Sequence, residues 1–378
     1  LFLKKINVIL QEDNRPQVII CCIPKQIEDY CGISERTRGA KTAKPTQLEK
    51  RINEFKNVNQ RFLGDFSVSI LPKNIKRKAY DFRNSLKGKA MQIKLPVPIQ
   101  LLRESTMDAI INYDCEGTNS RQDPASFSWN FSTALYYKAN GKPWRLAKLR
   151  QDTCYIGISF FKDKNSLNND MQTSMAQVFT NNGEGLVLRG EEVYTDELTK
   201  EAHLSESQAK QLIVNAIAQY VTKSKCAPVR VVIHKETLFS DVEKKGCSEA
   251  IGLVQKDFVT INKRKKFKFM RCGMYPVLRG TLIHLNFKEY LLYTSGYTPR
   301  IRTYPGHSVP QPLFITHIGD SQINDICKEI MGLTKLNWNT TSFSTAFPIT
   351  LEFSKKVGKI LSELDKSKEA QNHYRFYM

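Results

Sequence analysis

The 378-residue sequence lacks the cysteine pattern of a disulfide framework or a structural zinc site. Its nine cysteines are odd in number, no two of them form a Cys-x-x-Cys pair, and the six histidines are scattered. An odd number of cysteines does not suit a fully paired disulfide framework, and a structural zinc site needs clustered Cys and His ligands, so neither is expected. Cys21, Cys22 and Cys154 fall within or beside apolar runs, which predicts buried, reduced thiols in a cytoplasmic protein.

Long apolar runs are also missing. No stretch reaches the roughly 18 residues that a membrane-spanning helix needs, so no membrane association is expected. No signal peptide is visible in the sequence as it begins at Leu1. The glycine fingerprints of nucleotide-binding loops and the nucleophile elbow of hydrolases do not occur either.

Acidic residues are scarce relative to basic ones. The sequence has 57 Lys and Arg against 37 Asp and Glu, a formal net charge of +20, which favours a polyanionic partner such as nucleic acid. A basic protein with a solvated surface is the alternative. The length suffices for two domains with substantial cores.

The first third of the chain predicts an α/β domain of Rossmann type. Val18–Ile23 is a continuous apolar run ended by a proline, as in a buried parallel strand, and Lys25–Tyr30 is typical of a helix. Residues 46–62 and 73–91 are also typical of helices, and residues 66–71 alternate as in a strand. Strands that alternate with helices favour a parallel sheet.

A polar segment at residues 112–127, with a glycine and a proline, predicts a domain boundary. The expected domains are residues 1–125 and 126–378. In the second, residues 155–161, 185–189 and 229–234 are typical of strands, and Ser205 with Gln208 forms the capping-box pattern of a helix start. This order fits an RNase H-like core.

Two further stretches carry a family resemblance. Residues 136–146 place a lysine and a glycine before Lys-Pro-Trp-Arg-Leu, and the apolar run 154–160 follows. Together they resemble the start of the PIWI domain of Argonaute proteins. Residues 275–281, 293–296 and 333–339 match as well, so the resemblance covers nearly the whole chain. It is closest to the short prokaryotic Argonautes, which consist of a Rossmann-like MID domain and an RNase H-like PIWI domain.

Arg83, Lys87 and Gln100 are candidates for an anion site. The two cations are four residues apart and would share one helix face, where they repel by a few tenths of a kcal/mol unless an anion lies between them. A solvated helix face explains the same spacing. Gln100 follows an apolar, proline-rich run, and it needs a specific partner if buried or is an amide satisfied by the backbone of a loop.

The resemblance implies a role for these residues. In Argonautes, the 5′-phosphate of a guide strand is held by an aromatic or basic residue, a lysine four residues on, a glutamine about a dozen later and a lysine near the start of the PIWI domain. Arg83, Lys87, Gln100 and Lys138 match this order, with Lys142 as a second candidate for the last position. Many members have His or Tyr where this chain has Arg83, so phosphate binding is expected without stacking on the first base.

The resemblance also implies a loss of nuclease chemistry. A two-metal nuclease needs clustered carboxylates. The first catalytic aspartate of the family falls on Ser159, the third carboxylate on Glu236, and the last ligand near Lys355. Glu236 is equally well a surface residue at a strand end, and the remaining carboxylate could come from one of three residues, Glu184, Glu191 and Glu192.

Three other sequence features have both a functional and a purely structural interpretation. The block 263–268, followed by Phe269, could track a nucleic-acid backbone or form a hairpin edge guarded by lysines. His234 is expected to be a hydrogen-bonded core residue rather than a catalytic base. The aromatic tail that ends at Met378 would, by resemblance, place its carboxylate on a Mg²⁺ at the guide, or it is a frayed tail on the surface.

The resemblance thus predicts a nuclease-inactive subunit that binds guide RNA or DNA and pairs it with a complementary target. Similar short Argonautes work with a separate chain that carries an APAZ domain and an effector, often a TIR or sirtuin-like domain that degrades NAD. A guided endonuclease and a general basic RNA- or DNA-binding protein are the alternatives.

Overall fold

The computed structural model describes residues 1–31, 82–113, 123–147, 149–150, 152–162, 172–179, 185–195, 201–263, 267–301, 309–338, 341–361, 363–364 and 370–378. The chain forms two compact units, one of Leu1–Gly141 with Glu363–Ala370 and one of Lys142–Ser362 with Gln371–Met378. The first unit includes helix α7 (Pro124–Lys138), which packs on one of its strands, and the domain boundary expected near residue 125 stays a prediction.

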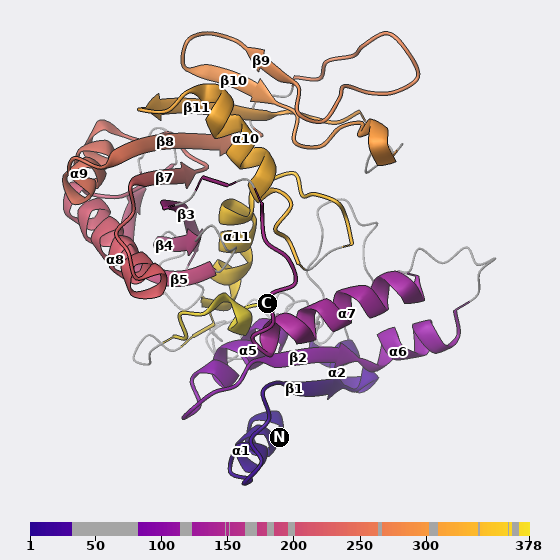
Figure 1. Cartoon of the computed structure of the whole chain (residues 1–378). Helices are drawn as coiled ribbons and strands as arrows, with labels where there is room; N and C mark the ends of the chain where they lie inside the picture. Colours follow the sequence, from indigo (N-terminus) through magenta and orange to yellow (C-terminus); the bar gives the residue numbers. More distant parts are fainter. Residues whose placement is uncertain are drawn as a thin grey trace, which may run out of the picture. The chain divides into compact units, whose positions relative to one another are not determined.

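The first unit contains two parallel strands, β1 (Ile19–Ile23) and β2 (Ile99–Arg103), which pair from Ile19 opposite Ile99 to Ile23 opposite Arg103 (Figure 1). This confirms the predicted strand and its parallel pairing. The described helices of the unit, besides α7, are α1 (Phe2–Leu10), α2 (Lys25–Cys31), α5 (Phe82–Met91) and α6 (Glu104–Ile111). The helix predicted at 46–62 and the strand predicted at 66–71 lie outside the described residues.

Side chains on one face of β1 form the core of this unit. Ile19, Cys21 and Ile23 are buried with residues of α1 and α5, whereas Ile20 and Cys22 are exposed. The continuous apolar run therefore predicted burial on both faces where the structure shows an alternating pattern.

The described part of the second unit has a nine-stranded mixed sheet in the order β6-β5-β4-β3-β7-β8-β11-β10-β9. Its central strands, β3 (Thr153–Lys162), β7 (Arg230–Lys235) and β8 (Gln255–Asn262), are parallel to one another, and the flanking pairs are antiparallel. The flanking strands are β4 (Gln172–Phe179), β5 (Gly185–Thr195), β6 (Ala202–His203), β9 (Leu282–His284), β10 (Glu289–Leu292) and β11 (Leu313–Gly319). The strands predicted at 155–161, 185–189 and 229–234 are confirmed.

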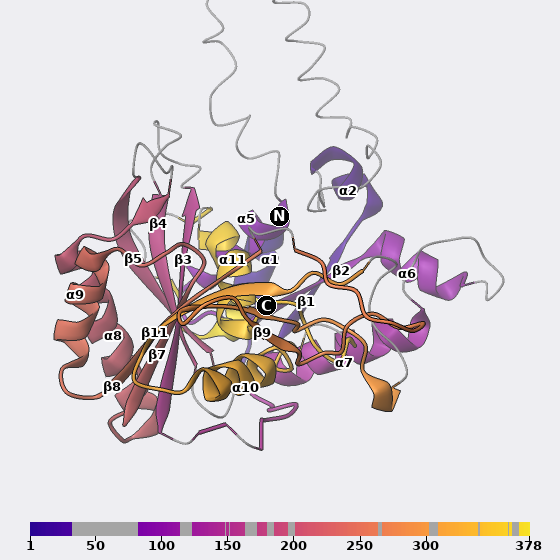
Figure 2. The same cartoon turned by 90° about the horizontal axis from the view of Figure 1, so that it is seen from above.

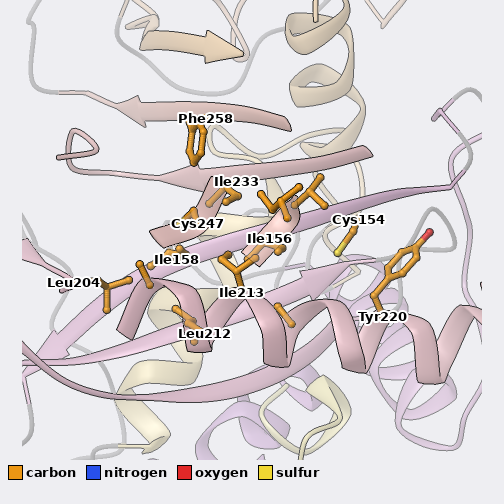
Figure 3. Close-up of a cluster of buried hydrophobic side chains, with 14 of the residues drawn as sticks. Cys154, Ile156, Ile158, Leu204, Leu212, Ile213, Tyr220, Ile233, Cys247 and Phe258 are labelled. Atoms are coloured by element: carbon orange, nitrogen blue, oxygen red, sulfur yellow. The ribbon is translucent and has the colours of Figure 1, made fainter. Parts of the chain in front are cut away.

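Helices cover both faces of this sheet (Figures 1 and 2). Ile156 and Ile158 of β3 point into a core shared with α8 (Glu206–Ser224) and α9 (Asp241–Ile251), as Figure 3 shows. Gly157, between them, faces α11 (Ile349–Leu361): a Cβ atom there would lie 2.1 Å from the carbonyl oxygen of Thr350. Alternation along β3 thus gives each face its own helix partner.

Local capping explains where two of these helices begin. The side chain of Ser205 accepts from the backbone of Gln208, whose side chain accepts from the backbone N–H of Ser205, which confirms the predicted capping box of α8. Ser240 and Glu243 form the same box at α9. The carboxylate of Glu243 also accepts from the buried ammonium of Lys235 at 2.5 Å, and so ties the start of α9 to the end of β7.

Two short helical turns, Pro299–Ile301 and Tyr374–Phe376, and helix α10 (Ile323–Leu333) complete the described elements. No helix among them is long and apolar enough to cross a membrane.

Candidate nucleic-acid interface

The ammonium group of Lys138 is the centre of the candidate site in the first unit. Lys138 is the last residue of α7, and only 1% of it is exposed. Its Nζ donates to the carbonyl oxygen of Ile99 at 3.0 Å and to Oε1 of Gln100. The structure therefore brings together two residues that were predicted to share a site although they are 38 positions apart.

Gln100 lies in strand β2 rather than in a loop, so the loop alternative is wrong. Its Nε2 donates to the carbonyl oxygen of Leu101 at 3.1 Å. That bond uses the amide's donor end and leaves its oxygen directed at Lys138. The glutamine thus orients the ammonium without adding negative charge.

Helix α5 contributes the other two predicted residues. Arg83 is half-buried and Lys87 is 3% exposed, so the expected four-residue spacing falls on a helix, and the solvated-face alternative is wrong for Lys87. Asn84, on the same helix, is 1% exposed. Lys87 and Asn84 thus place polar groups on the buried face of α5.

Burial and like charge both act on Lys138. Burial, followed by the charge of Arg83, lowers the pKa of Lys138 to about 7, and Cys21 opposes the shift. Cys21 lies on β1, where burial raises the pKa of its thiol to about 11. Among the described residues, no carboxylate forms an ion pair with Lys138. An arriving phosphate would supply the missing negative charge.

Sequence reasoning missed Asn84 and Cys21. The signal for Asn84 was present, because Asn84, Lys87 and Met91 recur at spacings of three and four and all three are buried. Cys21 gave no such signal, since a cysteine in an apolar run is ordinary.

Lys142, the second candidate for the last position, belongs to the second unit and is exposed. Lys138 is the candidate that contacts Gln100. The structure thus shows the contact with Gln100 for Lys138, the first of the two candidates.

The positions expected to match catalytic residues of the family lie on neighbouring strands in the second unit. In the parallel pair β3 and β7, Ile158 lies opposite Lys235, so the next positions along the two strands are Ser159, still inside β3, and Glu236, directly after the end of β7. Carboxyl ends of adjacent parallel strands are where α/β folds assemble sites. Glu236 is half-buried there, and its backbone carbonyl accepts from Asn262 at 3.2 Å.

The other positions expected to match catalytic residues of the family are less fully described. Lys355 lies on α11, but its side chain and those of Glu191 and Glu192 are outside the described residues, as is all of Glu184. Across the part of the chain that the structure describes, no group of three or more His, Cys, Asp and Glu side chains is placed to hold a metal ion.

His234 has the structural role that its position predicted. It is 1% exposed, and its Nδ1 lies 2.8 Å from the hydroxyl of Thr350 on α11. Burial is the main cause that lowers its pKa to about 3, so the ring is neutral in the native protein. Its ring links β7 to α11.

The C-terminal residues are integrated into the second unit. The carbonyl oxygen of Asn372 accepts from the backbone of Val187 at 2.7 Å, and Tyr374 stacks on Phe353 with ring centroids 3.9 Å apart. Met378 is only 5% exposed. The frayed-tail alternative is therefore wrong, and the Mg²⁺ role of the Met378 carboxylate stays a prediction.

The basic block after β8 is only partly described, since residues 264–266 lie outside. Lys263 Nζ lies 5.3 Å from the ring centre of Phe347, and Phe267 and Phe269 are 46% and 36% exposed. Its role in tracking a nucleic-acid backbone stays a prediction.

The sequence was compared with protein families and with individual known proteins. No protein-family model matches the sequence. A protein argonaute of Cereibacter sphaeroides is 22% identical over 311 residues, which are 73% of this chain and 37% of that protein.

Solved structures show the same fold. Drosophila Piwi matches with a TM-score of 0.63 at 12% identity over 100% of this chain and 44% of its own. Clostridium butyricum Argonaute, bound to a guide DNA and a 19-mer target DNA, gives 0.59 at 16% identity over 77% and 36%. Aa-Ago with externally bound siRNA gives 0.55 at 14% identity over 99% and 43%. The chain thus spans less than half the length of each of these four proteins.

Proposed function

Because the chain is homologous to argonaute proteins and has their MID–PIWI fold, we propose that it binds the 5′-phosphate of a short guide strand and pairs the guide with a complementary target. The observation that carries this proposal is the buried ammonium of Lys138. It is oriented by Gln100 and the Ile99 carbonyl, and no carboxylate of the described residues neutralises it.

The chemistry of a terminal phosphate suits this site. A phosphate monoester offers several anionic oxygens, each of which accepts charge-assisted hydrogen bonds. Lys138 has a third N–H beyond the two that it donates within the unit, and Lys87 and Arg83 supply further donors from α5. A phosphate near Lys138 would raise its pKa again, so guide binding would restore the charge that burial suppresses.

A Mg²⁺ ion, if present, would neutralise part of the charge of the guide phosphates. The Met378 carboxylate is the group proposed to hold it. The residues do not fit the two metal ions of a nuclease, since Ser159 has no carboxylate. We therefore assign the chain no cutting activity.

Without cutting chemistry, an output requires another chain. The proposed partner carries an APAZ domain and an effector, TIR or sirtuin-like, that degrades NAD when the target pairs, as part of a prokaryotic defence complex. Such activation requires the guide–target duplex to bind the active assembly more tightly than the resting one.

The first experiment compares guides that differ only at the 5′ end. Lys87→Ala and Lys138→Ala should each weaken binding of a 5′-phosphorylated guide about ten-fold or more, because a charge-assisted hydrogen bond contributes roughly 1.5–3 kcal/mol. Binding of the 5′-hydroxyl guide should change much less. Lys89→Ala, an exposed cation on the same helix, is the matched control and should leave both affinities near wild type.

Equal losses for both guides would overturn the phosphate assignment and favour a general basic nucleic-acid-binding protein. The partner is tested separately, by mixing the chain with a candidate APAZ–effector chain, guide and target and following NAD. A chain that is purified from cells with guide but with no second protein would contradict the partner proposal.

A further inference from the structure

A cavity of about 710 Å³ lies within the second unit. Its walls come from α10, from residues 146–149 before β3, and from residues 279–282 and 292 around β9 and β10. Most of the lining is apolar, contributed by Leu146, Leu149, Leu282, Leu292, Cys327 and Met331. Its size falls within the range of about 300–1,000 Å³ that is typical of small-molecule sites.

Two glycines form part of the cavity wall. Gly280 has a φ of +94°, and its nearest side-chain neighbour is the methyl group of Met331, 3.6 Å from where a Cβ would be. Gly332 is the next-to-last residue of α10, and a Cβ there would lie 3.4 Å from the side chain of Leu146. Because neither residue has a side chain, neither reduces the volume of the cavity.

Two cations, Arg279 and Lys335, line the same cavity. The guanidinium of Arg279 is fixed by neutral acceptors: Nη2 donates to the hydroxyl of Thr334 at 2.7 Å and to the carbonyl of Met331 at 3.2 Å. The ring of Phe343 lies near both charges, with its centre 5.4 Å from Arg279 and 4.8 Å from Lys335.

The electrostatics of this pair are unfavourable without a ligand. Burial lowers the pKa of Arg279, and burial together with the charge of Arg279 lowers the pKa of Lys335. Neither forms an ion pair with a carboxylate among the described residues. Lys328, also at the cavity, does pair with Asp325, at 3.3 Å. An anion between Arg279 and Lys335 would relieve their repulsion.

We propose that this cavity is a binding site for a small organic anion with an apolar body. The anionic group lies between Arg279 and Lys335, and the apolar body rests on the side chains of Leu149, Leu282 and Met331. The site belongs to the second unit alone, and it is distinct from the proposed guide-phosphate site around Lys138.

The test uses two fluorescent probes that differ only by an anionic sulfonate group. They are 8-anilinonaphthalene-1-sulfonate and its neutral analogue N-phenyl-1-naphthylamine. The full chain should bind one equivalent of the sulfonate. Lys335→Gln should weaken sulfonate binding about ten-fold or more and change binding of the neutral probe less than about three-fold. Met331→Trp, which fills the apolar floor, should weaken both.

Lys210→Gln removes an exposed lysine on α8 and is the matched control, expected to bind both probes as the wild type does. Thermal melts establish that each variant is folded. Sulfonate binding that is absent, or unchanged in both Lys335→Gln and Met331→Trp, would overturn the proposal. Displacement of the sulfonate by one equivalent of a guide oligonucleotide would also overturn it, because the cavity would then belong to the nucleic-acid path.

Discussion

Burying a charged ammonium group costs desolvation free energy. The ammonium group of Lys138 is buried, and its hydrogen-bond partners among the described residues are neutral. The two hydrogen bonds to Ile99 and Gln100 replace part of its hydration but none of its countercharge. Its pKa, lowered to about 7, expresses that cost. Such groups are typical of binding sites, where the compensating charge arrives with the ligand.

The lowered pKa has a consequence for stability. Below pH 7 the native and unfolded states both carry the proton, so the cost of burying the charge is fully present. Between pH 7 and about 10.4 the unfolded state still holds the proton that the native state has released, so stability of the guide-free protein rises with pH. Lys138→Met should remove this contribution.

Urea unfolding between pH 6 and 9 measures the effect. The free energy of unfolding should rise more steeply with pH in the wild type than in Lys138→Met, by up to about 1.4 kcal/mol per pH unit above pH 7. The difference between the two proteins cancels the contribution of other titrating groups. Parallel pH profiles would show that Lys138 keeps its proton in the native state.

At the scale of elements, helix α11 determines how closely the second face of the sheet is packed. Gly157 lets α11 approach β3 until backbone meets backbone, and the bond from His234 to Thr350 fixes the same contact from β7. Ser159 lies on β3 and Lys355 lies on α11, so these two elements carry two of the positions expected to match catalytic residues of the family. A displacement of α11 would therefore move the backbone of Lys355 relative to Ser159.

Gly157→Ala should destabilise the protein by about 1–3 kcal/mol or more, because the new methyl group would overlap the carbonyl of Thr350 and backbone cannot rotate away. Chemical denaturation measures the loss. Gly332→Ala is the comparison: its Cβ would meet only the ends of two leucine side chains, at 3.4 and 4.0 Å, so its effect should stay within about 1 kcal/mol. Equal losses of stability in the two variants would mean that α11 can move away from β3 at little cost in free energy.

At the scale of the whole molecule, a strongly basic chain has a candidate phosphate site in one unit. In the other unit it has Ser159, at the position where we expect a cutting enzyme of this kind to carry its first catalytic aspartate. Binding and cutting are separable chemistries, because binding needs donors and positive charge whereas two-metal cutting needs clustered carboxylates. The formal charge of +20 favours the binding of nucleic acid and does not contribute to two-metal cutting.

The purified chain, loaded with guide and a fully complementary target, should yield no cleavage product with Mg²⁺ or Mn²⁺. Gel analysis of end-labelled target detects a cut strand at low levels, and Ser159→Ala should give the same trace as the wild type. A guide-dependent cut at one defined position, lost in Glu236→Ala, would show that the remaining residues still hold metal.

The local sequence determined much of the fold. The buried strands at 19–23, 153–162 and 230–235 and the start of α8 were predictable, because apolar runs and capping residues act over a few positions. The boundary between the units was not predictable to the residue, since the packing of α7 on β2 decides it.

The sequence by itself also predicted the residue types of the candidate phosphate site, which are two cations four residues apart, a glutamine and a lysine near the start of the second unit. It also showed that Ser159 stands where a carboxylate would be needed for cutting. Only the tertiary structure decided that Lys87 is buried, that Gln100 meets Lys138 rather than Lys142, and that the tail up to Met378 is packed in the second unit. The physical reason is that burial and contact across 38 positions depend on how strands and helices pack, and no local pattern encodes that packing.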